Sequence, residues 1–558
     1  MSILRILFPT LIILAAILGC ARQTVPTGGP KDTIPPVMQL STPPNNSINF
    51  KGDKVQLQFD EHIILDNPKE QILITPNVGK DYEIVAKKKT VTLTFNQPLQ
   101  DSTTYSINFR DGIKDITEKN PPRNLKLAFS TGTYIDSLII RGSIKDPLND
   151  KEIKNATVAL YQSDTFNIFA HKPSYITKTN DKGFFSIENL KPGNYYLYAF
   201  NDANRNLIVD SKTEGYAFST DTIQLKRNLT IPTLNYFRLD SRPIKLTSAR
   251  PYNTYYNIKL SKTFRTYKIT TEENDSISSI LAEDNSSIKV YRTFTQDSLQ
   301  VRLQATDSLN QIVDTTLFVK FSPRKVTPEP FQVTPSDWRL FADRAQIQGT
   351  LQFNKPIQQI NYDSIFFQVD SLTRIPLTQA DIHINTITRK ITITKDVDKK
   401  LFRTSTEQPT QQRPTPGKAK PTAQNNVMHI RESAFISVES DSSKAIQEQL
   451  RVYTSEETGI IQVNIQTVEP YYVVQLLDPS FKIIRSARNQ SSIKFAELLP
   501  GDYQLRMVID YNNDGSWTPG DITKRIPTEP IKFYQTEKKS PIINLKANWE
   551  IGPLLISF

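Results

Sequence analysis

Apolar and polar residues alternate with a period of two along most of this chain, and this alternation limits the folds that it can adopt. Residues 55–59 place Val, Leu and Phe on one face, and residues 90–95 and 298–303 repeat the arrangement. Such runs, separated by Pro, Asn, Asp and Gly, are typical of half-buried antiparallel strands. Helical spacing is rare, and residues 443–450 are one short segment that shows it. The sequence therefore predicts an all-β protein of tandem antiparallel β-sandwich domains.

A chain of 558 residues is too long for one hydrophobic core. Turn-rich breaks in the alternating pattern divide it into five predicted sandwiches: residues 37–133, 134–238, 239–330, 331–457 and 458–558. The fourth sandwich contains a predicted disordered insert at 403–426, which is rich in Pro, Thr, Gln and Lys.

An internal repeat joins the second predicted domain to the fifth. Residues 190–197 and 498–505 share Leu, Pro, Gly, Tyr and Leu at matching positions without a gap. The register continues into a polar segment, where Asp202, Asn204 and Asn206 align with Asp510, Asn512 and Asp514. We therefore expect residues 458–558 to be a second copy of the domain at 134–238.

Two domain types are suggested by short motifs. Residues 55–61, the Thr103-Thr104-Tyr105 segment and the closing Phe129-Ser130-Thr131-Gly132 resemble the bacterial Ig-like domain first described in S-layer proteins. A weaker match between residues 345–357 and 55–63 predicts a divergent Ig-like domain at 331–457. The Gly-x-Phe and Leu-x-Pro-Gly-x-Tyr-x-Leu series of the repeated domain resembles the transthyretin-like module appended to carboxypeptidases. Residues 239–330 carry no family signature.

The N-terminal segment predicts a lipid anchor. Residues 6–18 are an apolar run of signal-peptide length, and the run closes on Ile17-Leu18-Gly19-Cys20. This motif resembles the lipobox of bacterial lipoproteins, which implies a signal peptide at 1–19 and lipidation of Cys20. Residues 20–36 are rich in Pro, Gly and Thr and read as a tether.

The tether sequence also indicates the cellular location. Residues 28–36 resemble the opening of a family of Bacteroidetes envelope lipoproteins, which implies attachment to the outer membrane. Surface-exported lipoproteins of Bacteroidetes often carry acidic residues directly after the cysteine, and residues 21–25 contain none. This favours the periplasmic face slightly.

Charge and composition argue against several functional classes. The net charge of +11 is spread along the chain, and its densest cluster, Lys87-Lys88-Lys89, lies between two strand-like runs, as expected of a hairpin tip. Nucleic-acid binding would gather basic and aromatic residues on one face, so we expect no such partner. With Cys20 lipidated, no cysteine remains for a disulfide or for thiol catalysis. No two of the four histidines lie within five residues of each other.

An acidic loop in the second copy of the repeat has the spacing of a calcium-binding loop. Oxygen-bearing side chains stand at its first, third, fifth and twelfth positions: Asp510, Asn512, Asp514 and Asp521. Gly515 stands sixth, where an EF-hand-type loop turns sharply. The first copy offers a weaker set without the glycine: Asp202, Asn204, Asn206 and Asp210, with Glu214 as a further carboxylate. The alternative is an Asx-rich hairpin whose side chains bond their own backbone. Any metal here would stiffen a loop rather than catalyse.

No catalytic motif stands out, so the leading hypothesis is a non-enzymatic lipoprotein, a rod of β-sandwiches that presents surfaces to an envelope protein or polysaccharide. The first alternative is a glycan-binding lipoprotein of a nutrient-capture system, which would use exposed aromatics such as Trp338 and Trp517. For Trp517 we favour packing across its hairpin. The second alternative is a hydrolase whose carboxylates converge between domains.

Overall fold

The computed structural model describes residues 31–558 except 163–164, 274–276, 323–325, 343, 386 and 400–425. Strands make up nearly all of the regular structure in these residues, and they form five modules. Each module has its own hydrophobic cluster, and Tyr255, Ile280 and Tyr291 of the third module also join the cluster of the fourth. The predicted all-β fold of tandem β-sandwich domains is therefore confirmed. The signal peptide, Cys20, most of the tether and nearly all of the insert lie outside the described residues. Within the described residues, every helix is too short or too polar to cross a membrane.

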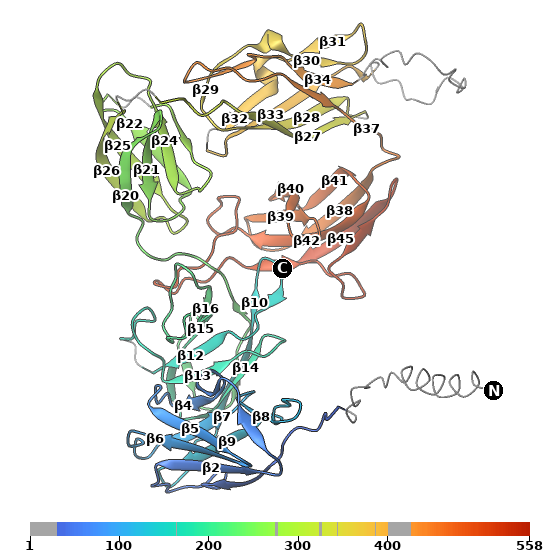
Figure 1. Cartoon of the computed structure of the whole chain (residues 1–558). Coiled ribbons are helices and arrows are strands. Elements are labelled where there is room, and N and C mark those ends of the chain that lie inside the picture. The colour runs from blue at the N-terminus through green and yellow to red at the C-terminus, as the bar shows by residue number, and fades with distance from the viewer. Residues whose placement is uncertain are drawn as a thin grey trace, which may run out of the picture.

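The first module spans residues 37–133 (Figure 1). Its elements are β1 (Met38–Thr42), β2 (Lys54–Phe59), β3 (Ile63–Leu65), α2 (Pro68–Gln71), β4 (Leu73–Thr75), β5 (Tyr82–Lys87), β6 (Thr90–Phe95), β7 (Thr104–Asn108), β8 (Ile113–Asp115) and β9 (Lys126–Ser130). A sheet in the order β1-β2-β6-β5 packs on a sheet in the order β4-β7-β9, and β3 pairs with β8. Burial alternates residue by residue along β2 and β6, as the sequence pattern predicts. The three lysines at 87–89 form the expected hairpin tip between β5 and β6.

The second module spans residues 134–238. Its strands are β10 (Leu138–Asp146), β11 (Lys151–Glu152), β12 (Thr157–Tyr161), β13 (Tyr175–Lys178), β14 (Phe184–Leu190), β15 (Gly193–Phe200), β16 (Tyr216–Phe218), β17 (Ile223–Leu225), β18 (Leu229–Thr230) and β19 (Leu234–Asn235). One sheet has the order β11-β10-β14, with β18 and β19 parallel to β10. The other has the order β13-β12-β15-β16, with β17 also on β15. The hydrophobic core lies between them.

The fifth module, residues 458–558, repeats this topology. Its strands are β38 (Gly459–Gln466), β39 (Tyr472–Leu477), β40 (Ile483–Arg488), β41 (Ser492–Leu498), β42 (Gly501–Ile509), β43 (Ile531–Phe533), β44 (Ile543–Leu545) and β45 (Glu550–Ser557). The sheets have the orders β41-β38-β45 and β40-β39-β42-β43, with β44 on β42 and β45 parallel to β38. The buried Tyr195 and Tyr503 also match, because each hydroxyl donates to the carbonyl four residues earlier, at 2.9 and 2.7 Å. Residues 134–238 and 458–558 thus share one fold.

The third and fourth modules lie between these two copies. The third, residues 239–330, contains β20 (Leu246–Tyr252), β21 (Tyr255–Leu260), β22 (Thr266–Thr270), β23 (Ser279–Leu281), β24 (Ser287–Tyr291), β25 (Ser298–Thr306) and β26 (Ile312–Lys320). The fourth, residues 331–457, contains β27 (Val333–Phe341), β28 (Gln346–Phe353), β29 (Ile357–Ile360), η1 (Tyr362–Ser364), β30 (Ile365–Gln368), β31 (Arg374–Pro376), η2 (Gln379–Asp381), β32 (Ile382–Asn385), β33 (Lys390–Asp396), β34 (Val427–Ile430), β35 (Phe435–Ser437), β36 (Ile446–Gln449) and β37 (Val452–Tyr453).

One secondary-structure prediction in the fourth module is wrong. The sequence predicts a helix over residues 443–450, but Ile446–Gln449 within this segment form β36, which pairs with β34. The exposure of side chains alternates along β36, so its apolar Ile446 fits a strand as well as a helix. An eight-residue window does not separate the two periods, and the neighbouring strand supplies hydrogen bonds that decide between them.

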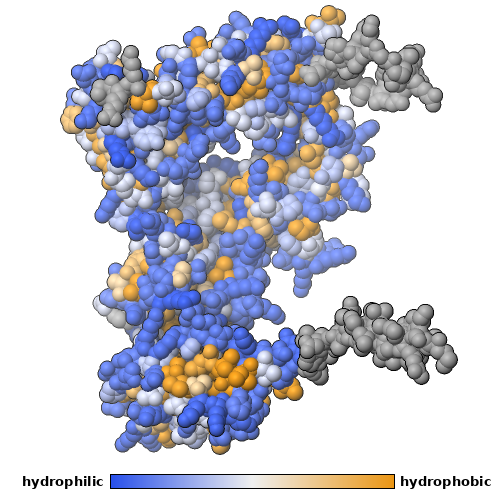
Figure 2. Space-filling view, in the orientation of Figure 1, coloured by the Kyte–Doolittle hydropathy of each residue, from blue (hydrophilic) through white to orange (hydrophobic). Residues whose placement is uncertain are grey.

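The five modules do not form a rod. The chain runs from the second module through the third and fourth, and then returns so that the fifth module packs on the second (Figure 1). Arg265 of the third module and Arg344 of the fourth also form ion pairs with the fifth, at 2.7 and 2.8 Å. Modules two to five therefore close a ring, and the space-filling view shows the gap that they surround (Figure 2). The first module lies outside the ring against the second, where Lys126 and Glu188 form an ion pair of 2.9 Å.

Candidate functional site

The predicted ligand residues lie in two matching loops, each of which follows the longest strand of its sheet. The first loop, residues 201–215, connects β15 to β16, and the second loop, residues 510–530, connects β42 to β43. Because β15 and β42 occupy the same place in the repeated fold, both loops leave the same end of their modules. The structure therefore brings the first three predicted residues of each set together.

Side chains of the second loop accept hydrogen bonds from the loop's own backbone. The carboxylate of Asp510, which is 1% exposed, accepts from the amides of Asp514 and Gly515 at 2.9 and 2.8 Å. The Asn512 side-chain oxygen also accepts from the Asp514 amide at 3.0 Å, and Asp514 accepts from the Ser516 amide at 2.8 Å. This is the Asx-rich arrangement that the sequence left open as the alternative to calcium.

The first loop repeats these bonds position by position. Asp202 accepts from the amides of Asn206 and Leu207 at 3.0 and 3.2 Å. Asn204 accepts from the Asn206 amide at 3.1 Å, and Asn206 accepts from the Ile208 amide at 2.7 Å. The two loops thus share one backbone conformation, although the first lacks the glycine of the second.

The remaining predicted ligands, Asp521 and Asp210, each accept hydrogen bonds from their own turn. Asp521 accepts from the amide and hydroxyl of Thr523, at 2.9 and 2.6 Å. Asp210 likewise accepts from residues 212 and 213 of its own turn. Guanidinium groups of Arg488 and Arg265 contact Asp510 and Asp514, at 3.3 and 2.7 Å.

Calcium binding by these residues stays a prediction. Throughout the described part of the chain, no three His, Cys, Asp or Glu side chains are grouped so that they could hold a metal ion. The two arginines already supply positive charge to the carboxylates that calcium would need. Guanidinium groups of the third and fifth modules thus contact two carboxylates of this loop.

A buried glutamate in each loop completes the backbone bonding. Glu214 and Glu529 stand two residues before β16 and β43, and they are 0% and 5% exposed. Glu214 accepts from the amides of Ala203 and Asp210, both at 2.9 Å, and Glu529 accepts from the Thr518 amide at 2.7 Å. Sequence reasoning missed Glu529, because seven extra residues separate it from the aligned position. Both glutamates stand two residues before the next strand, and this shared position was the signal that could have identified Glu529.

Both glutamates are harder to ionise than a free side chain. Burial raises the pKa of Glu529 above its usual 4.5, and the nearby charges of Asp510 and Asp514 act in the same direction. Burial likewise raises the pKa of Glu214, with a smaller contribution from Asp202. Hydrogen bonds from the backbone oppose these shifts without cancelling them. Such buried carboxyls support the loop conformation.

The second loop also forms the apolar contact between the fifth module and the second. Ile522, 4% exposed, joins an aromatic cluster on the second module that contains Phe200, Tyr216 and Phe237. The ring of Trp517 lies edge-on to Phe237 with centroids 6.5 Å apart, and its Nε1 donates to the carbonyl of Glu529 at 2.9 Å. Trp517 therefore packs between modules rather than across its own hairpin alone.

Polar contacts surround this apolar centre. The Asn235 side-chain amide donates to the Thr528 hydroxyl at 2.8 Å. Arg525 donates to the Ser219 carbonyl at 3.2 Å, and its guanidinium stands 5.0 Å from the Tyr196 ring centroid. The buried Arg506 of β42 donates to the Leu148 carbonyl of the second module. An apolar centre with a polar rim is the usual anatomy of a specific protein interface.

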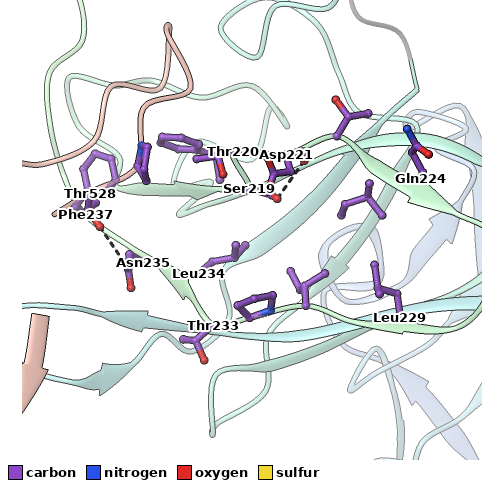
Figure 3. A pocket seen from close by; sticks show the side chains of 16 residues that line it. Ser219, Thr220, Asp221, Gln224, Leu229, Thr233, Leu234, Asn235, Phe237 and Thr528 are labelled. Atoms are coloured by element: carbon purple, nitrogen blue, oxygen red, sulfur yellow. Dashed lines mark hydrogen bonds between the residues drawn. The ribbon is translucent and has the colours of Figure 1, made fainter. Parts of the chain in front are cut away.

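A cavity of about 410 Å³ adjoins this interface (Figure 3). It lies between the β16–β17 edge of one sheet and the β18–β19 edge of the other, so it marks the seam where the two sheets of the second module separate. Pro527 and Thr528 of the fifth module close one end. Threonine, serine and asparagine side chains share its walls with leucine and phenylalanine (Figure 3).

Other buried charged groups form ion pairs within single modules. Lys355, fully buried in the fourth module, pairs with Glu439 and Asp441 at 2.6 and 2.8 Å. In the third module the buried Lys262 and Asp307 pair at 2.5 Å. Trp338, which the sequence suggested for sugar stacking, packs over Gly349 and contacts the core of the fourth module. These side chains serve the fold.

Comparison with known proteins identifies one module. Residues 32–131 match the bacterial Ig-like domain family, which agrees with the prediction for the first module. No curated protein matches the chain.

Similar solved structures are distant. The major pilin subunit of Bacillus cereus is 11% identical, with 75% of this chain and 98% of the pilin covered and a TM-score of 0.12. The SGBP-B protein of a Bacteroides ovatus mixed-linkage glucan utilization locus, solved with a mixed-linkage heptasaccharide, is 11% identical over 64% of this chain and 86% of its own, with a TM-score of 0.15. An L,D-transpeptidase from Mycobacterium smegmatis is 10% identical over 36% and 89%, with a TM-score of 0.14. At such TM-scores none of them supports a functional conclusion.

Proposed function

We propose that this chain is a non-enzymatic, lipid-anchored scaffold of the bacterial outer membrane that presents β-sandwich surfaces to a protein or polysaccharide of the cell envelope. The observation that carries the proposal is the return of the fifth module onto the second. An apolar centre around Ile522 and Phe237, ringed by hydrogen bonds, holds modules that lie about 300 residues apart in the chain. Fixed modules in a closed ring suit a platform better than a flexible spacer.

The buried charged groups support a non-catalytic role. Catalytic carboxyls usually line a cleft that a substrate can enter. Here Glu214, Glu529 and Asp115 accept hydrogen bonds from the backbone of their own loops, and Lys355 is neutralised by two acids of its own module. Their hydrogen-bonding capacity is used in holding loops and strands.

The anchor and location rest on the N-terminal motif. The apolar run of residues 6–18 followed by Gly19-Cys20 supports export and lipidation, and the tether would place the first module next to the membrane. Several acyl chains on Cys20 would anchor the protein firmly, because each buried methylene contributes about 0.8 kcal/mol. The periplasmic face is proposed because residues 21–25 lack acidic side chains.

Membrane fractionation of a Cys20→Ala variant tests the anchor. We expect the natural chain in the outer-membrane fraction and the variant in soluble fractions, while a Gln23→Ala control stays with the membrane. Protease treatment of intact cells then tests the face, since a periplasmic scaffold is protected until the cells are lysed. Outer-membrane retention of Cys20→Ala would contradict the lipid anchor.

A further inference from the structure

We propose that the outer edge of β45 docks an extended segment of a partner protein, which pairs as an added strand and carries alternating apolar side chains with acidic residues at its ends. The proposal rests on the proposed scaffold function, because it assigns the surface through which the scaffold would hold its partner. Strand addition at a sheet edge is a recurrent mode of peptide recognition.

The first observation is the open edge itself. β45 runs parallel to β38 on one side, and among the described residues no strand pairs with its other side. The amide and carbonyl groups on that side of an edge strand are available to a new strand.

The second observation is the composition of this edge. Residues 551–558 carry no charged side chain, and Leu555 and Phe558 are 58% and 43% exposed. Proteins usually protect exposed edges with charges, proline or bulges. β45 has Pro553 and a register shift in its first half, so the second half, from Leu554 onward, lacks such protection.

Two other edge strands of this molecule, β26 and β5, show the protection that β45 lacks. β26 is an edge strand with an exposed Phe318, but it also carries Asp314, paired with Arg302, and Lys320. β5 is an edge strand with Glu83 and Lys87. An exposed apolar residue on those strands stands between charges that would disfavour an added strand.

The third observation is the space beside the edge. Two cavities of about 430 and 580 Å³ border β45, and both are lined by Tyr534. The first lies between β43 and residues 555–557, and the second has apolar walls that include Ile543, Ile551 and Leu554. Alternate side chains of an added strand point to opposite faces, so those on one face could enter these cavities.

The second module contains a precedent for docking at this place. Its seam cavity lies beside β18 and β19, which pair parallel to β10 just as β45 pairs parallel to β38. There, Pro527 and Thr528 of the fifth module close one end, and Asn235 bonds Thr528 at 2.8 Å (Figure 3). The chain thus already docks a short segment at one of its two equivalent seams.

Charge favours an acidic partner over a second copy of this chain. Residues 530–550, which precede β45 and contribute to both cavities, contain four lysines and two glutamates, a net charge of +2. The whole chain carries +11, so two copies repel each other, whereas an acidic segment is attracted.

A fluorescent twelve-residue peptide tests the proposal: two aspartates, four Val-Thr pairs and two aspartates, titrated with the whole chain by fluorescence polarisation. We expect saturable binding and at least a tenfold weaker affinity for the same peptide N-methylated at its valine amides. N-methylation removes backbone donors and retains the side chains, so it separates strand pairing from general apolar adhesion.

Two variants locate the binding. Leu555→Lys should weaken the affinity at least tenfold, although the added positive charge by itself would attract the acidic peptide. Phe318→Lys places a lysine on another edge strand, β26. The affinity of this variant for the peptide should stay within about twofold of that of the natural chain.

Three outcomes would overturn the proposal. They are absence of binding up to roughly 1 mM peptide, equal binding by Leu555→Lys, and equal binding of the N-methylated peptide. Sedimentation velocity adds a fourth, since a dimer that Leu555→Lys dissociates would assign the edge to a second copy, whereas a monomer supports the proposal. Each result is independent of the Cys20→Ala fractionation, so failure here leaves the anchor proposal standing.

Discussion

Leu207 and Gly515 occupy matching positions in the repeated loops, and both take a left-handed backbone, with φ of +62° and +82°. Glycine adopts this conformation freely, whereas an L side chain pays about 1 kcal/mol or more. Leu207 holds it because its amide donates to Asp202, as the Gly515 amide donates to Asp510. The Asx side chains therefore determine the loop conformation, and the glycine makes it easier to reach.

Gly515→Ala should destabilise the protein by about 1–3 kcal/mol, measured by urea unfolding. A Cβ at this position would lie 2.7 Å from the Arg488 guanidinium, which would have to move away from Asp510 and Asn513. Gly501→Ala is the matched control, because no atom lies within 4 Å of its Cβ position and its backbone is not left-handed. Equal stability of the two variants would contradict the strain argument.

Glu529→Gln should change how stability depends on pH. Because burial raises the pKa of Glu529 in the folded state above 4.5, the folded state binds its proton more tightly than the unfolded state. The stability that this carboxyl contributes is fully present below pH 4.5 and is lost as the pH rises through the folded pKa.

Glutamine does not ionise, so the free energy of unfolding of the variant, relative to the natural protein, should rise from about pH 4 to pH 7. Urea unfolding across this range measures it, with the exposed Glu537→Gln as control. A difference that stays constant with pH would show that Glu529 titrates alike in both states.

At the scale of elements, the strands were largely predictable and their partners less so. Alternation marked β2, β6 and β25, because each buries one face against a second sheet and exposes the other. Residues 443–450 predict a helix because a short apolar spacing fits both periods, but Ile446–Gln449 pair with β34 as a strand. The acidic spacing at 510–521 predicts a calcium loop, which stays a prediction, and the structure shows that Asp510 bonds the backbone of its own loop.

At the scale of the whole molecule, contacts across the ring determine the shape. The loop at 510–530 reaches the second module through Ile522 and the third module through the pair of Asp514 with Arg265. The sequence predicts a row of independent sandwiches, because no local pattern in it indicates which modules contact each other. The predicted rod was wrong because the loop's apolar side chains are removed from water when they pack on the aromatic cluster, and this burial stabilises the closed arrangement.

Ile522→Asp should open the ring. The charge would be placed against Phe237 and its neighbours, at a cost of about 2–4 kcal/mol, so the fifth module should detach from the second. Small-angle X-ray scattering should show a larger radius of gyration and a longer maximum dimension. Ile526→Asp is a control on the same loop, because Ile526 is 51% exposed. An unchanged radius for Ile522→Asp would show that the ion pairs of Arg265 and Arg344 hold the ring alone.

The sequence by itself determined the all-β class, the Ig-like first module and the repeat that relates residues 134–238 to 458–558. These follow from local patterns, namely alternation, turn residues and matched motifs, which a chain carries wherever its modules lie. Only the tertiary structure decided that the acidic loops bond their own backbones, that Glu529 supports one of them and that the fifth module closes on the second. The spacing of the acidic residues allows either self-bonding or a cation site, so it does not decide the first of these. The other two depend on contacts between residues too far apart in the chain for a local pattern to indicate them.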